Sequence, residues 1–148
     1  MGLGIKGYSN IVKDEDGSIE ISSCGSFKQE NLKELEGLTL ECEECYKFRA
    51  GSYGGYNRFR DNLCKSANGI TAKELWGKED ESLKFYWLIN FSDCDGYIGT
   101  SYCEILYNEF VKYEDEILSK LDGRDANTYK DFKECFNLGR QKGFVLFM

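Results

Sequence analysis

The stretch Gly143-Phe144-Val145-Leu146-Phe147-Met148 carries no polar side chain. A strand that is apolar at every position needs cover on both faces, so we expect it at the centre of a sheet. Residues 3–12 and 18–22 alternate between apolar and polar side chains and are separated by a turn at 14–17, which is typical of a hairpin. Together these runs predict a small mixed or antiparallel sheet of N-terminal strands plus this C-terminal strand.

Three longer segments show the apolar period of a helix. Each is bounded by residues that begin or stop helices. The pairs of boundaries are Ser52 and Asn68-Gly69, Thr100 and Gly123, and Asn127 and the region 139–143. We therefore predict an α+β fold in which about three helices cover the sheet.

Shorter segments add detail to this prediction. A charged helix is expected over 28–35, an extended segment over 46–49, and a helical turn over 71–76, where Thr71 and Glu74 have capping-box spacing. Residues 83–91 form a dense apolar run that must be buried, but its period fits either a helix or a strand.

Composition limits the class of protein. A chain of 148 residues predicts one domain, 1–148, and its net charge of −7 argues against binding to nucleic acid or an anionic membrane. No run approaches the ~20 apolar residues of a membrane span, and the start lacks the apolar run of a signal peptide, so we expect a cytoplasmic protein. Seven cysteines, an odd number, are expected as reduced thiols. Histidine is absent, which excludes Ser-His and Cys-His nucleophiles.

Two polar stretches, 49–60 and 90–99, gather Gly, Arg, Asn, Ser, Asp and aromatic residues. We expect them to face one another and to bind a ligand through Arg49, Ser52, Tyr53, Tyr56, Asn57, Arg60, Asn90, Ser92 and Asp93. Arg49 and Arg60 would clamp a phosphate or carboxylate, while Gly54 and Gly55 leave the helix start open to an anion. The alternative is structural: a glycine-rich turn, arginines paired with carboxylates, and aspartates that bond their own backbone.

Three known motifs are approached but not completed. An EF-hand loop from Asp93 would need glycine at Ile98, and a phosphatase-type Asp93-Cys94-Asp95-Gly96 would need more chain after it than is present. Cys42 and Cys45 form half of a zinc site without a second pair. We therefore expect no metal and no cofactor.

The chain resembles a family of uncharacterised small bacterial and phage-borne proteins. The likeness rests on Met1 to Ile5, Phe48 to Asn57, Ile89 to Gly96 and Gly143 to Phe147, with departures at Gly4, Gly54 and Asp95. No activity comes with this resemblance. It implies a shared fold and a phage or prophage setting, in which sequestering a signalling nucleotide is one possible task.

Three classes of function stay open at this point. The first is a binding module for a small anionic, phosphate- or nucleotide-like ligand. The second is an acidic protein-interaction module of the inhibitor or immunity type, with a protein as partner. The third is a histidine-free enzyme with Asp93 or Asp95 as general base and an arginine opposing the developing charge.

Overall fold

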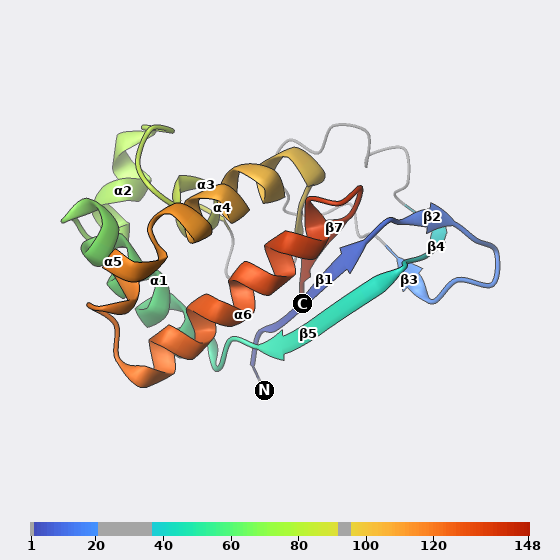
Figure 1. Cartoon of the computed structure of the whole chain (residues 1–148), viewed down its shortest axis with the longest axis horizontal. Helices are drawn as coiled ribbons and strands as arrows, with labels where there is room; N and C mark the ends of the chain where they lie inside the picture. Colours follow the sequence, from blue (N-terminus) through green and yellow to red (C-terminus); the bar gives the residue numbers. More distant parts are fainter. Residues whose placement is uncertain (1, 21–36, 92–95) are drawn as a thin grey trace.

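The computed structural model describes residues 2–20, 37–91 and 96–148, and it has an α+β architecture (Figure 1). The larger sheet has the order β5-β1-β7-β6, and all neighbouring strands are antiparallel. Its strands are β5 (Glu44–Arg49), β1 (Gly4–Ser9), β7 (Phe144–Phe147) and β6 (Gly96–Ile98). A smaller antiparallel sheet has the order β2-β4-β3 and consists of β2 (Val12–Lys13), β4 (Thr39–Glu41) and β3 (Ile19–Glu20). The predicted fold class is confirmed.

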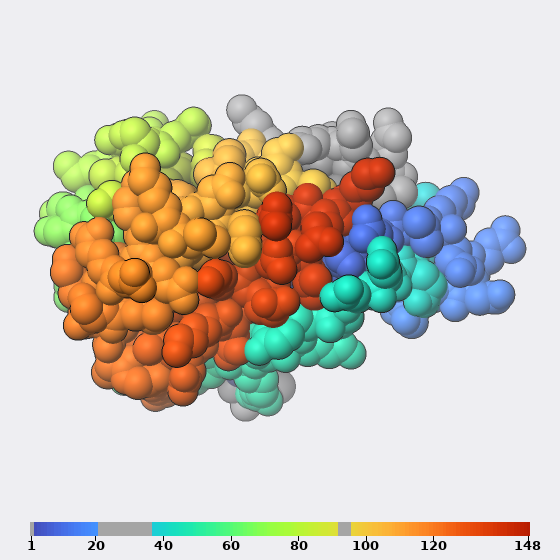
Figure 2. Space-filling model, viewed as in Figure 1, coloured from blue at the N-terminus to red at the C-terminus, as the bar shows by residue number. Residues whose placement is uncertain are grey.

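The helices lie against the larger sheet and beyond one of its ends (Figure 1). They are α1 (Tyr53–Asn68), α2 (Ala72–Lys78), α3 (Tyr86–Ile89), α4 (Thr100–Lys112), α5 (Glu114–Leu118) and α6 (Gly123–Gly139). The longest, α6, packs on β1, β5 and β7, and α4 packs on α6. Figure 2 shows this helical layer, with the end of the molecule formed by β2 and β3 projecting beyond it.

The central position predicted for the C-terminal strand is confirmed, because β7 lies between β1 and β6 with all four residues buried. Val145 and Phe147 join the main core beneath the helices. Phe144 and Leu146 face the other way and join a second, smaller core with residues of the small sheet. A continuous apolar strand is therefore matched by a core on each face.

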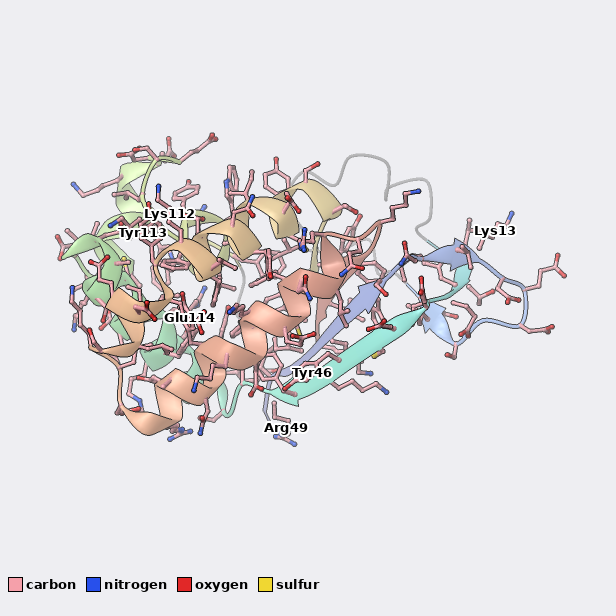
Figure 3. All side chains as sticks on the ribbon, viewed as in Figure 1. Lys13, Tyr46, Arg49, Lys112, Tyr113 and Glu114 are labelled. Carbon is pink, nitrogen blue, oxygen red and sulfur yellow. The ribbon has the colours of Figure 1, made fainter. Side chains whose placement is uncertain are left out.

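The packing of α6 on β1 requires a glycine at position 7. A Cβ on Gly7 would lie 2.7 Å from the Cα of Cys135, which is closer than real atoms approach. The contact is fixed at its edge by Tyr46, whose hydroxyl donates to Asp131 at 2.6 Å (Figure 3). The position of α6 over β1 thus depends on the absence of a side chain at Gly7 and on the hydrogen bond between Tyr46 and Asp131.

The predicted helix over 100–121 is interrupted, which corrects the sequence analysis. The chain leaves helical geometry at Tyr113, where φ is −103° and ψ is 9°, and α5 begins at the next residue. The first turn of α5 is entirely acidic, and carboxylates stabilise the positive end of a helix. Glu114 also forms an ion pair with Lys133 of α6 at 2.6 Å. A new helix start is therefore favoured in the middle of an unbroken apolar period.

Two other boundaries and one pairing also differ from prediction. The cap of α6 is Asp122, whose Oδ1 accepts from Asp125 N at 2.8 Å, so the helix begins before Asn127. Gly99, not Thr100, is the N-cap of α4. The predicted hairpin is wrong, because β3 pairs with β4 and β1 pairs with β5 and β7.

The apolar run 83–91 contains the short helix α3. Its entry residue, Phe85, is in the left-handed region with φ 61° and donates its amide to Glu109 Oε2 at 2.9 Å. The helix predicted over 28–35, and residues 21 and 22 of the predicted second strand, lie outside the described residues. Within the described residues, no helix is both long enough and apolar enough to cross a membrane.

Candidate functional site

The chain turns from β5 into α1 at residues 50–52, and the N-terminal segment holds this turn in place. Leu3 N donates to Gly51 O, and Ala50 N donates to Leu3 O, both at 2.9 Å. Gly51 has φ 95°, a conformation that strains any residue with a side chain. The turn is therefore fixed relative to β1.

Ser52 begins α1 as predicted, and its Oγ accepts from Gly55 N at 3.0 Å. Tyr56 N donates to Ser52 O, which closes the first turn. The amides of Tyr53 and Gly54 precede that closure, so the helix itself offers them no acceptor. The first turn carries no acidic side chain, so the positive end of the helix dipole is left available to an anion.

Two exposed arginines flank this helix start. A Cβ on Gly2 would lie 2.5 Å from Arg49 Nη2 and 2.4 Å from Gly51 O, which places Arg49 beside the turn. Cβ atoms on Gly51 and Gly55 would lie 3.3 and 3.2 Å from Arg124 Nη2. Figure 3 shows Arg49 directed away from the end of β5. Among the described residues, neither guanidinium group has a hydrogen bond or an ion pair. We call Arg49, Arg124 and residues 51–55 the α1 entrance.

Arg124 was missed in the sequence analysis, because α6 was expected to begin only at Asn127. With the cap at Asp122, Arg124 lies in the first turn of α6. A cation there opposes the helix dipole, at a cost of a few tenths of a kcal/mol or more. A basic residue in the first turn of a helix is therefore the sequence signal that could have identified Arg124, because such a residue does not stabilise the helix.

Arg60, predicted to complete a clamp with Arg49, is 4% exposed. Its Nη1 donates to the carbonyl oxygens of Ile89, at 3.1 Å, and Phe91, and its Nη2 donates to Asn57 Oδ1. These bonds connect α1 to the end of α3, so the first polar stretch does reach the beginning of the second. With both terminal nitrogens directed to protein groups, however, Arg60 contributes to the interior rather than to an accessible clamp.

Aromatic rings enclose the same guanidinium group. Its Cζ lies 4.9 Å from the centre of the Tyr56 ring and 5.2 Å from that of Trp76, distances typical of cation–π contacts. Tyr56 is fully buried, whereas Tyr53 is 45% exposed. Of the two tyrosines predicted to contact a ligand ring, only Tyr53 presents its ring to solvent here.

The second polar stretch is described in part. Asn90 donates its side-chain amide to the Tyr86 hydroxyl at 3.2 Å. Ser92 and Asp93, with Cys94 and Asp95 of the motifs considered above, lie outside the described residues. Whether Asp93 faces an arginine therefore stays a prediction.

Of the two cysteines of the half zinc site, Cys42 lies between β4 and β5 and is half-buried, and Cys45 lies in β5 and is exposed. Burial, followed by the proximity of Cys45 and Glu41, raises the pKa of Cys42. Across 2–20, 37–91 and 96–148, no three Cys, Asp or Glu side chains gather as a metal site would require. Comparison of the chain with protein-family models, curated proteins and solved structures finds no match. The likeness to bacterial and phage-borne proteins stays a prediction.

Proposed function

We propose that this protein is a binding module for a small anionic, phosphate- or nucleotide-like ligand, and that the α1 entrance is its binding site. The observation that carries the proposal is the pair Arg49 and Arg124, which lie beside one helix start without carboxylate partners among the described residues. The chain has 26 acidic and 19 basic side chains, so partners for arginine are plentiful elsewhere.

The chemistry of the entrance suits an oxyanion. Guanidinium groups bind phosphate and carboxylate in a forked geometry, and free amides at a helix start add donors. Gly54 is exposed, and the nearest atom to a Cβ there would be Ser52 Oγ at 4.0 Å, so a ligand can approach the backbone closely. The exposed Tyr53 offers a ring for a base to stack on, which would favour a nucleotide over phosphate alone.

Calorimetric titration with phosphate, pyrophosphate and nucleoside mono-, di- and triphosphates at low salt tests the proposal. A charge-assisted hydrogen bond contributes about 1.5–3 kcal/mol, so Arg49→Ala or Arg124→Ala should each weaken binding at least about tenfold. Tyr53→Ala should weaken nucleotide binding while leaving pyrophosphate binding unchanged.

The matched control is Arg58→Ala, because Arg58 is an exposed arginine of α1 beyond the entrance. This variant should bind like the wild type. The proposal fails if no anion binds in the range tested, or if Arg58→Ala is as damaging as Arg49→Ala and Arg124→Ala.

A further inference from the structure

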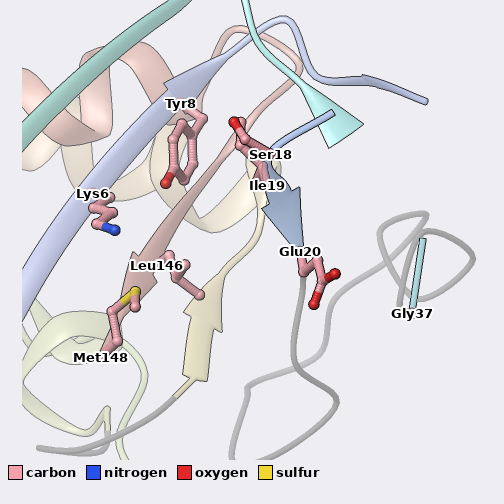
Figure 4. A pocket seen from close by; sticks show the side chains of 8 residues that line it. All are labelled: Lys6, Tyr8, Ser18, Ile19, Glu20, Gly37, Leu146 and Met148. Carbon is pink, nitrogen blue, oxygen red and sulfur yellow. The ribbon is translucent and has the colours of Figure 1, made fainter. Parts of the chain in front are cut away.

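A hollow lies on the face of the larger sheet opposite the helices, where the small sheet approaches it (Figure 4). Its volume is about 380 Å³, and it adjoins a second hollow of about 350 Å³ with which it shares Lys6, Tyr8, Ser18 and Ile19. Leu146 and Met148 complete its apolar wall. This size falls within the range of small-molecule sites, which combine apolar walls with a few polar groups.

Tyr8 is the central polar group of the hollow. Only 6% of the residue is exposed, and its ring packs against Phe144 with 5.3 Å between ring centres. Within the described chain its hydroxyl has no hydrogen-bond partner, and Figure 4 shows that hydroxyl on the side of Lys6 and Leu146. Burial, followed by the proximity of Cys45 and Cys42, raises the pKa of Tyr8 to about 12, so the group is a protonated donor at neutral pH. The hydroxyl is therefore available as a hydrogen-bond donor to a molecule in the hollow.

Two lysines supply positive charge beside this donor. Lys6 reaches the first hollow, and both Lys6 and Lys47 line the second. Neither ammonium group has an ion pair among the described residues. The hollow also has carboxylates, but Glu41 already accepts from Ser18 N at 2.9 Å and from Ser18 Oγ.

The remaining carboxylate, Glu20, extends from β3, away from Lys6 in the view of Figure 4. The arrangement therefore has a cationic, hydrogen-bond-donating side at Lys6 and Tyr8. Next to it is an apolar wall formed by Ile19, Leu146 and Met148. Such a site matches a ligand with an anionic head and an apolar body.

We propose that this hollow binds a small organic anion with an apolar body, an aryl or short acyl carboxylate or phosphate, separately from the α1 entrance. The head accepts a hydrogen bond from the Tyr8 hydroxyl and pairs with Lys6, while the body packs on Leu146 and Ile19. The inference does not rest on the function proposed for Arg49 and Arg124, because neither arginine lines either hollow.

Two-dimensional NMR with titration tests the inference. The probes are phenylacetate and hexanoate, their phosphate counterparts phenyl phosphate and butyl phosphate, and the neutral amides phenylacetamide and hexanamide. We expect an anion of one or both head types to shift the resonances of Ile19 and Leu146 saturably, and the matching amide to bind at least about tenfold more weakly because it has no charge for Lys6. Comparison of the two head types identifies the preferred anion.

Variants make the test specific. Tyr8→Phe removes a hydroxyl that has no partner in the described chain, so it should fold with unchanged stability and bind the anion about fivefold or more weakly. Lys6→Met should weaken binding about tenfold or more. The matched control is Lys13→Met, because Lys13 is an exposed lysine of β2 outside the hollow (Figure 3), and it should bind like the wild type.

Three outcomes would overturn the inference. The first is that the amides bind as tightly as the anions. The second is that Tyr8→Phe and Lys6→Met both bind like the wild type. The third is that no probe shifts Ile19 or Leu146. Arg124→Ala should leave this binding unchanged, which separates failure here from failure of the α1 entrance.

Discussion

Replacement of Arg60 by methionine tests the interior connection between α1 and α3 directly. Methionine replaces the aliphatic part of the arginine side chain with an unbranched apolar chain but removes the charge and every donor. The Phe91 carbonyl then loses the donor described above. The Ile89 carbonyl keeps a second one, since Trp76 Nε1 donates to it at 2.7 Å.

The magnitude follows from two opposing effects. Removal of a guanidinium group that is 4% exposed ends the cost of keeping a charge away from water. Against this, the variant loses hydrogen bonds to three acceptors, each worth about 1.5–3 kcal/mol when the donor is charged, and two cation–π contacts. We expect the losses to dominate, with a net decrease of about 3 kcal/mol in the free energy of unfolding. At 148 residues this lowers Tm by about 6–12 °C.

Urea unfolding followed by circular dichroism measures the change, provided the slope of free energy against denaturant is unchanged. Arg58→Met is the control, because an exposed arginine of the same helix should change stability by less than about 0.5 kcal/mol. Arg60→Lys should fall between the wild type and the methionine variant, since an ammonium group cannot reproduce the planar fork. If Arg60→Met is within about 1 kcal/mol of the wild type, the charge is not held by these carbonyls and the reasoning is refuted.

Three further outcomes are expected. Gly54→Ala and Gly77→Ala are both at helical positions with room for a Cβ, so each should raise the free energy of unfolding by about 0.5–1 kcal/mol in urea titrations. Only Gly54→Ala should weaken anion binding at the α1 entrance, and equal binding by both variants would contradict the role given to Gly54. Burial raises the pKa of Glu109, so the folded state holds this proton more tightly than the unfolded chain and loses stability as pH rises. The free energy of unfolding of Glu109→Gln, measured relative to that of the wild type, should therefore increase from pH ~4 to ~7, and a difference that does not change with pH would contradict this. Iodoacetamide should modify exposed Cys45 in the folded protein, but it should modify Cys135 only after denaturant is added, because burial raises the pKa of the Cys135 thiol. Peptide mass spectrometry would detect both modifications, and labelling of Cys135 in the folded protein would contradict its burial.

Local signals in the sequence were sufficient for much of the fold. Ser52 and Gly69 bound α1 as their chemistry predicts, and Thr71 with Glu74 forms the full capping box of α2. The position of β7 also followed from one property, since a strand without polar residues has no face that tolerates water. These features depend only on residues within a few positions of one another.

The interior place of Arg60 could not be predicted in this way. Asn57, Arg60 and Cys64 form a polar stripe beside the apolar stripe of α1, and such a stripe usually faces solvent. Here α2 and α3 pack against α1, and Arg60 and Cys64 are buried. The period of a helix shows which residues share a face, but not how many neighbours cover it.

The α1 entrance depends on an even longer-range relation. Nothing near Gly51 in the sequence indicates that Arg124 approaches it, because that contact requires β5, α1 and α6 to be assembled first. Basic side chains in other parts of the described chain provide a comparison, because several of them form ion pairs. Lys133 lies 2.6 Å from Glu114, and Arg140 lies 3.4 Å from Glu104, as expected where carboxylates outnumber basic groups. Arg49 and Arg124 have no such partner among the described residues, and in the function proposed above an oxyanion bound at the α1 entrance would supply one.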